Sequence, residues 1–286
     1  MISKIHLLLL LFSFLLSSCT GFIFQPTDIQ YIDPEKNHIQ YQDVYFKTEN
    51  NIKLHGWFLP SRETKPKGTI LFLHGNAQNI TAHINSVFWL PYFGFNVFLF
   101  DYQGYGQSEG APSLSGVQQD FHHALQWLVD NPTIDKNKII VFGQSLGATI
   151  SLYALSQSKY KDSIRGMVAD SGFTSYRNIA QDFLNNSWLT WAFQWPLSYT
   201  ISDDYPAINA IPQISPVPLL IIHSLDDRVI PYHHGVTLFK AAKEPKYFWT
   251  LKKIKHINIF SVKQNRIIFV EYLNAMLSNQ FPIENN

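Results

Sequence analysis

The chain has 286 residues, of which 46% are hydrophobic and 15% are charged, and its net charge is +1 at pH 7. This balance supports a sizeable buried core and excludes intrinsic disorder. The net charge is close to zero and the sequence has no basic run, so no long-range field points to nucleic acid or to acidic partners. We therefore expect no nucleic-acid partner.

The N-terminus has the pattern of a secretory signal. Lys4 precedes an apolar run, Ile5–Leu16, that is too short to span about 30 Å of hydrocarbon but suits the central region of such a signal. The following Leu-Ser-Ser-Cys ends at Cys19 and resembles the bacterial lipobox, whose cysteine is diacylated and becomes the first residue of the mature protein. The resemblance implies a lipoprotein signal peptide over residues 1–18 and lipidation of Cys19.

Cys19 is also the only cysteine of the chain, so a disulfide within the chain is impossible. The alternative is an ordinary signal peptide, or a short uncleaved anchor, with an incidental cysteine. Lipidation implies a protein held on the periplasmic or extracytoplasmic face of a membrane by its N-terminal lipid anchor. Thr20 in place of aspartate implies the outer membrane if the host is Gram-negative.

The remainder of the chain has the length of one domain. We expect an N-terminal tether over residues 19–42 and a single domain over residues 43–280. Val44–Thr48 and Ile52–Leu59 alternate apolar and polar residues around a polar turn. This alternation predicts an antiparallel hairpin at an edge of the sheet.

Continuous apolar runs follow the hairpin and are separated by helix-length segments. The runs are Thr69–Leu73, Asn96–Phe100, Lys138–Phe142, Ile164–Ala169 and Pro218–Ile222. Such runs are typical of strands that are buried on both faces, as in a parallel sheet covered by helices. In Ser115–Asp130, apolar residues recur at helical spacing. The alternation predicts a mostly parallel, doubly wound α/β sheet.

One stretch, residues 173–215, interrupts this alternation because it contains no clear sheet strand and is rich in aromatic residues. These residues are Phe183, Trp188, Trp191, Phe193, Trp195 and Tyr199. A long insertion in a compact domain is usually functional. We expect a small helical cap that covers the active site and favours apolar acyl groups, with part of the aromatic residues forming the core of the insertion itself.

The segment Gly143–Gly147, Gly-Gln-Ser-Leu-Gly, follows an expected strand and opens an apolar helical segment. This is the G-x-S-x-G nucleophile elbow in its required strand–turn–helix setting. The turn forces the serine into a strained backbone conformation, and the glycines allow neighbouring chains to approach closely. The serine then stands at a helix N-terminus, where N–H groups favour a developing anion. Ser145 is therefore the candidate nucleophile.

The acid and the base are expected later in the chain, in that order. The strand Pro218–Ile222 ends shortly before two adjacent aspartates, Asp226 and Asp227, and either can be the acid. His256 is the only histidine near the C-terminus, and it follows one more expected strand, Tyr247–Leu251. His256 is therefore the candidate base.

Five ordered motifs together resemble the esterase/lipase-like α/β-hydrolase-domain family of bacteria and eukaryotes, whose members carry a small cap. The motifs are His74–Ala77 (HGNA), Asp101–Gly110 (DYQGYGQSEG), Gly143–Gly147, Asp227–Pro231 and the late His256. The resemblance covers about Val44 to Leu277 and implies the α/β-hydrolase fold. These motifs are specific for the family but not for a substrate, because one fold hosts many chemistries.

The resemblance also implies roles for individual residues. The backbone N–H groups of Asn76 and Leu146 are expected to form the oxyanion hole. The acid of the family stands three residues before a β-branched residue and proline, and counting back from Ile230 selects Asp227 over Asp226.

Several other positions near these motifs also have expected roles. His74 is expected to be structural, and Tyr102 is a candidate to line the pocket. Three positions depart from the family. Gln103 replaces a usual arginine and so removes an ion pair, Ser224 replaces a usual glycine, and Ile254-Lys255 replace small residues before the histidine. These departures leave the triad complete but weaken any inference about the substrate.

The implied activity is a serine hydrolase that cleaves carboxylic esters or thioesters through Ser145, His256 and Asp227 and an acyl-enzyme. An acyltransferase or a peptidase with the same triad is the main alternative, and a non-catalytic binding protein is a third. The expected partners are a small-molecule or lipid ester and the membrane that holds the lipid anchor. The physiological substrate, the acyl chain length and the oligomeric state stay open.

No cofactor and no metal are expected. The chain has no H-E-x-x-H motif. Its adjacent histidines, His122-His123 and His233-His234, are expected to point to different faces, which disfavours a shared ligand site.

Overall fold

The structure is a computed structural model, and it describes residues 23–185, 190 and 194–281. The expected signal peptide and the lipidation site, Cys19, lie outside the described residues. The strands of the main sheet are β2 Gln42–Lys47, β3 Lys53–Leu59, β4 Gly68–Leu73, β6 Phe95–Phe100, β7 Ile139–Gln144, β8 Ile164–Asp170, β9 Leu219–Ser224 and β10 Lys246–Leu251. The helices are α3 Ile80–His83, α4 Leu114–Asp130, α5 Leu146–Ser156, α6 Tyr176–Asn185, α7 Gln194–Ser198, α8 Ala207–Ala210, α9 Tyr232–Ala241 and α10 Lys263–Leu277.

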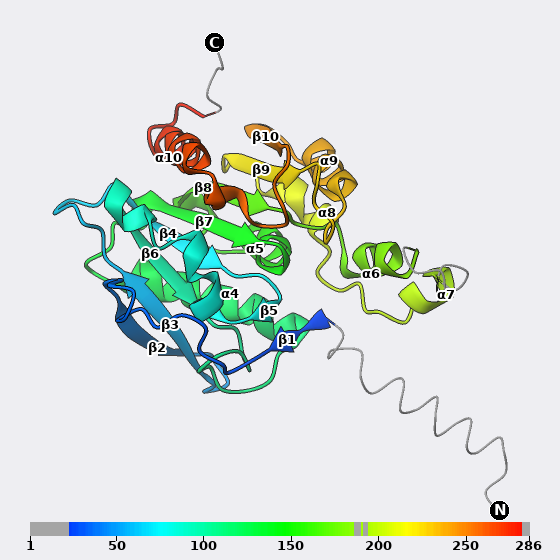
Figure 1. The fold of residues 1–286 in the computed structure, drawn as a ribbon, viewed down its shortest axis with the longest axis horizontal. Coiled ribbons are helices and arrows are strands. Elements are labelled where there is room, and N and C mark those ends of the chain that lie inside the picture. The colour runs from blue at the N-terminus through cyan, green and yellow to red at the C-terminus, as the bar shows by residue number, and fades with distance from the viewer. Residues whose placement is uncertain (1–22, 186–189, 191–193, 282–286) are drawn as a thin grey trace, which may run out of the picture.

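One eight-stranded sheet crosses the molecule in the order β10-β9-β8-β7-β4-β6-β3-β2 (Figure 1). The pairs β2–β3 and β3–β6 are antiparallel, and the other neighbours are parallel. The expected doubly wound sheet with an antiparallel hairpin at its edge is confirmed. Strand and helix ends differ from the expected ones by one or two residues, because caps and turns rather than apolar runs decide them.

The central strands are apolar throughout because helices cover both faces of the sheet. Leu71 and Val141 belong to the core beneath α4, α5 and α9, whereas their neighbours Phe72 and Phe142 belong to the core beneath α10. Successive residues of a strand point to opposite faces, so a strand buried on both sides needs apolar residues at every position.

The N-terminal segment that was expected to be a tether packs onto the domain from Phe24 onward. Phe24 is 3% exposed. A short strand, β1 Gln25–Pro26, pairs in parallel with β5 Ala77–Gln78. The side-chain amide of Asn79 donates to the carbonyl oxygen of Thr27. The segment therefore lies beside the loop that follows β4.

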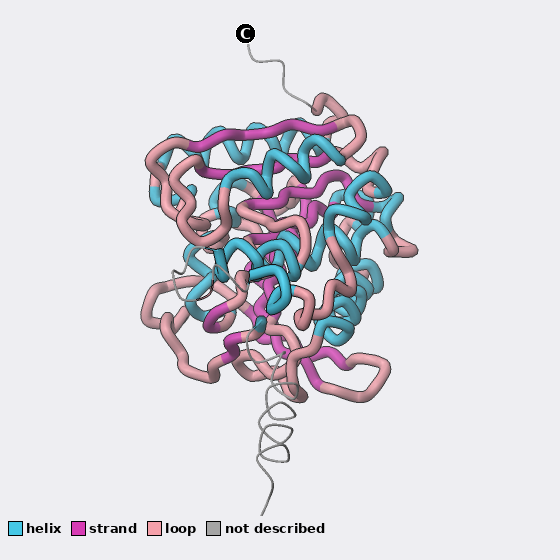
Figure 2. Tube along the Cα trace, turned by 90° about the vertical axis from the view of Figure 1, so that its right-hand side faces the viewer, coloured by secondary structure: helices cyan, strands magenta, loops and turns pink. Residues whose placement is uncertain are grey.

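The insertion after β8 contains α6 and α7, which project at one end of the molecule in Figure 1. Figure 2 looks onto that end. Trp188, Trp191 and Phe193 lie outside the described residues. The other expected aromatics, Phe183, Trp195 and Tyr199, are exposed rather than packed into a core. Among the described residues, no helix is both long and apolar enough to cross a membrane.

Candidate active site

Ser145 stands in the sharp turn between β7 and α5. Its backbone angles, φ +55° and ψ −116°, are strained for a residue with a side chain. A Cβ atom at Gly147 would lie 2.3 Å from the carbonyl oxygen of Leu73, and one at Gly143 would lie 2.5 Å from the carbonyl oxygen of Gly147. Both glycines of the motif are therefore required by the close approach of backbone groups.

Asp227 and His256 are brought together from two loops that are far apart in the sequence. The Nδ1 of His256 lies 2.7 Å from Oδ2 of Asp227. The other oxygen, Oδ1, accepts the backbone N–H groups of Val229 and Ile230, each at 2.9 Å. Burial raises the pKa of Asp227, but these hydrogen bonds outweigh it and hold that pKa below its usual value. An ionised Asp227 leaves Nε2 of His256 as the free nitrogen.

The neighbouring carboxylate of Asp226 is exposed and accepts the backbone N–H of Lys253 instead. The structure thus brings Asp227, and not Asp226, to the histidine. Ser224, which departs from the family's usual glycine, donates its hydroxyl to the carbonyl oxygen of Ile254 at 2.6 Å. This hydroxyl ties the loop of the acid to the loop that carries His256.

The sequence did not predict a second contact, which joins the elbow to the loop of His256. The side-chain amide of Gln144 donates to the buried Asp170 at 2.8 Å, and it also lies 3.5 Å from the carbonyl oxygen of Ile257. Burial raises the pKa of Asp170 to about 6. Ile257 has a positive φ of 48°, which is strained for a β-branched residue. These contacts link the elbow to the histidine loop.

Ser145 and His256 are not yet hydrogen-bonded. In the described part of the chain the hydroxyl of Ser145 makes no hydrogen bond, and Nε2 of His256 has no hydrogen-bond partner. Such contacts are often long in a free enzyme and tighten when a substrate binds. The histidine side chain is 15% exposed, so a proton carried by it has access to water.

Asn76, Ser145 and Leu146 all line one pocket. Within the described part of the chain, neither the backbone N–H of Asn76 nor that of Leu146 donates to another backbone group. The side chain of Asn76 is fixed, since its Oδ1 accepts from the hydroxyl of Tyr105 at 3.0 Å and from the backbone N–H of Gln25 at 3.1 Å. Two backbone donors without a backbone partner among the described residues therefore belong to residues that line the pocket of Ser145.

His74 and Tyr102 support the loop that carries Asn76. His74 is fully buried, with Nδ1 2.7 Å from the carbonyl oxygen of Gly75, and burial holds its pKa well below the usual value. The hydroxyl of Tyr102 donates to the carbonyl oxygen of His74 at 3.0 Å. Tyr102 is itself fully buried and does not line the pocket, so that expectation is wrong.

Gln103 binds a buried carboxyl group at the position where the family usually has arginine. Its side-chain amide donates to Oδ1 of Asp120 at 2.8 Å, and its backbone N–H donates to Oδ2 at 2.9 Å. Burial raises the pKa of Asp120 to about 7. Gln103 thus gives both oxygens of this buried carboxyl group a neutral hydrogen-bond donor.

The pocket beside Ser145 has a volume of about 110 Å³. It is lined by Ile23, Asn76, Ser145, Leu146, Phe173, Tyr176, Ile179, Ala180, Phe183, Ile201, Val229 and Ile230. None of these residues is charged, and the insertion after β8 contributes much of the wall. The pocket is an apolar cavity with a few polar groups at one end, which is the usual form of a small-molecule site.

Comparisons with known proteins identify the family. Residues 64–201 match the family model described as serine aminopeptidase, S33. The uncharacterized protein YfhR of Escherichia coli O157:H7 is 35% identical over 245 residues, which cover 84% of this chain and 82% of that protein. The α/β-hydrolase domain-containing protein WAV2 of Arabidopsis thaliana is 30% identical over 225 residues, or 75% of this chain and 71% of that protein. The chain belongs to the α/β-hydrolase family.

Solved structures of other α/β-hydrolases have the same fold. The esterase Pf2001 of Pyrococcus furiosus matches with a TM-score of 0.69 at 23% identity, covering 90% of this chain and 98% of that one. The esterase domain of a Rhodothermus marinus protein matches with a TM-score of 0.60 at 19% identity, covering 82% and 97%. At these identities the likeness establishes the fold.

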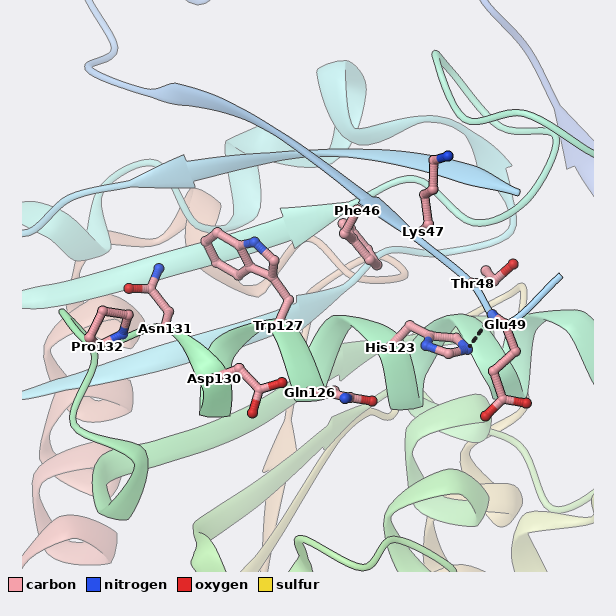
Figure 3. Close-up of a pocket in the computed structure, with 10 residues that line it drawn as sticks. All are labelled: Phe46, Lys47, Thr48, Glu49, His123, Gln126, Trp127, Asp130, Asn131 and Pro132. Atoms are coloured by element: carbon pink, nitrogen blue, oxygen red, sulfur yellow. Dashed lines mark hydrogen bonds between the residues drawn. The ribbon is translucent and has the colours of Figure 1, made fainter. Parts of the chain in front are cut away.

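This α/β-hydrolase has a larger hollow elsewhere, between β2 and α4, with a volume of about 740 Å³ (Figure 3). Its wall includes Lys47, Glu49 and Asp130, and His123 accepts the backbone N–H of Glu49 there at 3.2 Å. None of the candidate catalytic residues lines it. The smaller pocket is the candidate active site, because Ser145 lines it together with Val229 and Ile230, whose backbone N–H groups bind Asp227.

His233 and His234 were expected to point to different faces, and that expectation is wrong. Their rings stack at 4.5 Å, and their Nε2 atoms lie 3.2 and 2.8 Å from the same oxygen of Asp182. The backbone N–H of Thr174 donates to Nδ1 of His234 at 3.2 Å, so the proton of that ring is on Nε2 and points at Asp182. A nitrogen that donates in this way is a poor metal ligand. The cluster ties α6 of the cap to α9.

Proposed function

We propose that this α/β-hydrolase cleaves carboxylic esters or thioesters by nucleophilic catalysis at Ser145. The observation that carries the proposal is the pairing of Asp227 with His256 at 2.7 Å beside a serine in a strained elbow. The acid fixes the tautomer of the histidine and leaves Nε2 to accept a proton. The backbone N–H groups of Asn76 and Leu146 support the same proposal, because both residues line the pocket of Ser145 and N–H groups there would stabilise an oxyanion.

The reaction then has two halves. In the first, His256 takes the proton of Ser145 as its Oγ attacks the acyl carbonyl, and the two N–H groups hold the negatively charged oxygen. The tetrahedral intermediate collapses, the alcohol or thiol leaves with the proton of the imidazolium, and the acyl group stays on Ser145. In the second half, a water molecule loses its proton to His256, attacks the acyl-enzyme and releases the acid.

The walls of the pocket favour an apolar acyl group over a peptide with a free N-terminus. An aminopeptidase holds the α-ammonium group of its substrate, and a buried ammonium needs a paired carboxylate. None of the described residues that line the pocket is acidic. Peptide cleavage is the second candidate because the matching family model is described as a serine aminopeptidase.

A fluorophosphonate probe tests the nucleophile. We expect rapid labelling of the wild-type chain at Ser145, found by peptide mass spectrometry, and none in Ser145→Ala or His256→Ala. Turnover of p-nitrophenyl esters of increasing length is then compared with that of amino-acid p-nitroanilides. Butyryl or longer esters are expected to react faster than acetyl. A chain that takes no label is a binding protein, and faster cleavage of the anilides identifies a peptidase.

We also propose that the mature protein begins at a diacylated Cys19 and is anchored to a membrane on its extracytoplasmic face. The lipobox-like Leu-Ser-Ser-Cys supports this, since two acyl chains give stable anchoring where one gives marginal binding. Mass spectrometry of the native N-terminus tests it. An unmodified cysteine, or cleavage at another site, excludes the lipoprotein.

A further inference from the structure

Large apolar side chains are exposed on the two projecting helices of the cap and directly after the second of them. We define the cap face as Phe183, Trp195, Leu197 and Tyr199, whose exposed fractions are 44%, 60%, 42% and 64%. No residue from Phe183 to Ser202 carries a charge. Exposed apolar patches mark interaction surfaces, and Trp and Tyr suit the boundary between lipid and water.

The cap face continues into the active-site pocket. Phe183 belongs to both, because it is 44% exposed and also lines the pocket of Ser145. Val229, from the loop of the acid, is likewise 44% exposed and lines the same pocket. Apolar surface therefore leads from the outside of the cap to the nucleophile.

The N-terminal segment leaves the domain at this pocket. Ile23 lines the pocket, and β1 follows directly, on the same side of the molecule as α7 in Figure 1. Cys19 precedes Ile23 by four positions, so the link between them spans at most about 14 Å when fully extended. A lipid anchor at Cys19 thus holds the edge of the pocket within that distance of the bilayer surface.

We propose that the cap face docks on the lipid surface that holds the anchor, so that the mouth of the pocket opens onto the bilayer. The link is too short for the domain to turn this side away from the membrane. A second copy of the chain is a less favoured partner for the cap face. The short anchor brings a membrane surface next to each pocket, but it does not bring another protein molecule there. The enzyme would then act on acyl esters of membrane amphiphiles; this consequence rests on the proposed hydrolase function, whereas the docking does not.

The charges of the cap indicate how the docking works. Between Tyr176 and Pro206 the only charged residues are one arginine and three aspartates. Arg177 lies over the ring of Tyr199 at 4.9 Å and pairs with Asp203 at 3.8 Å. No excess of positive charge attracts anionic lipid, so buried apolar area supplies the binding and salt should have little effect on it.

The docking can be measured by a probe at one position, because Cys19 is the only cysteine and is blocked in the proposed lipoprotein. The full chain is placed in phosphatidylcholine vesicles with Trp195→Cys carrying a nitroxide label. Tyr92→Cys is the matched control, since Tyr92 is 62% exposed but lies on the short helical turn before β6. Collision with oxygen and with a water-soluble nickel complex then reports whether each label is in lipid or in water.

We expect the label at position 195 to collide mainly with oxygen, at low and at high salt, and the label at position 92 to collide mainly with the nickel complex. Equal exposure of both labels to the nickel complex overturns the docking. Labelling of the wild-type chain at Cys19 overturns the anchor and with it the inference. Spin–spin broadening that disappears on dilution with unlabelled chain identifies a second copy as the occupant.

Activity provides the second measurement. The double variant Trp195→Ser, Tyr199→Ser should hydrolyse a long-chain umbelliferyl ester in vesicles at least about tenfold more slowly than wild type, while its turnover of a soluble ester in detergent stays unchanged. Tyr92→Ser should change neither rate. Equal rates of wild type and double variant on the vesicle ester contradict the proposal. A wild-type chain that cleaves neither ester contradicts the hydrolase function and leaves the label result intact.

Discussion

The floor of the active site and the cap above it are built in different ways. Ser145 and Asp227 are less than a tenth exposed, and backbone groups fix both. Two cap residues, Phe183 and Trp195, are about half exposed, and the cap is joined to α9 by a cluster of one carboxylate and two histidines. We therefore expect changes in the floor to affect the reaction itself. Changes in the cap should affect which substrate is accepted and where the protein docks.

The sharpest test of the floor is the exchange of the two neighbouring aspartates. Asp227→Asn should lower kcat by up to about 10⁴, because an amide no longer stabilises the imidazolium and favours the wrong tautomer of His256. Asp226→Asn should cost less than about tenfold, because that side chain is exposed and accepts a hydrogen bond from the backbone of Lys253 rather than from His256. Steady-state turnover of p-nitrophenyl butyrate measures both, and the reverse ranking contradicts the assignment of the acid.

The second test removes the close approach at the elbow. Gly147→Ala places a methyl group 2.3 Å from a carbonyl oxygen that belongs to β4, so the strand or the helix must move. We expect a loss of about 1–3 kcal/mol or more in the free energy of unfolding, and a loss of fluorophosphonate labelling. Gly172→Ala is the control, since its nearest contact is 3.1 Å to the side chain of Ala148. Equal stability of the two variants contradicts the steric argument.

Sequence reasoning was effective for the floor because short motifs encode it locally. A G-x-S-x-G after an apolar run fixes a strand, a turn and a helix, and the spacing before Ile230-Pro231 selected the aspartate that the structure brings to His256. The apolar runs likewise predicted the sheet, since strands buried on both faces must be apolar at every position.

Contacts between distant segments could not be predicted in this way. The packing of β1 beside β5 and the position of Ile23 in the pocket depend on pairing between residues about fifty positions apart. The tie from Gln144 to Asp170 joins two polar residues that each look ordinary at the end of a strand. His233 and His234 both reach Asp182, which lies on another helix, α6. The sequence pattern of α9 alone does not show that contact.

The third test concerns the cap. Phe183→Ala should lower kcat/KM for octanoyl esters by about tenfold relative to acetyl esters, because lost apolar contacts in a pocket cost about 1–3 kcal/mol. Trp195→Ala is the control on the same cap, because Trp195 does not line the pocket. Its ratio of octanoyl to acetyl rates, measured with detergent-dispersed esters, should stay at the wild-type value. An equal loss on both esters in Phe183→Ala would show that this ring does not contact the acyl chain.

The smallest expected effect concerns the cluster of Asp182, His233 and His234 that joins the cap to α9. It is a change in the free energy of unfolding that appears only at acid pH. Burial, together with the charge of His233, lowers the pKa of His234 to about 4, although Asp182 opposes the shift and His223 adds slightly to it. An unfolded histidine binds its proton at about pH 6.5, so between about pH 6.5 and about pH 4 the unfolded chain holds one more proton than the folded one. The contribution of this ring to stability is complete above about pH 6.5 and is lost as the pH falls toward about 4.

Urea unfolding across that range measures this contribution as a slope. His234→Gln should lose stability on acidification less steeply than wild type, by at most about 1.4 kcal/mol per pH unit. His233→Gln is the matched control. Its ring is 60% exposed, and its charge is a smaller cause of the low pKa of His234 than burial is, so the slope should flatten less than in His234→Gln. Other buried histidines, such as His74, remain in both variants and cancel in the comparison. If His233→Gln flattened the slope as much as His234→Gln, the proton taken up in acid would belong to the pair, and the cap would be held by both rings equally.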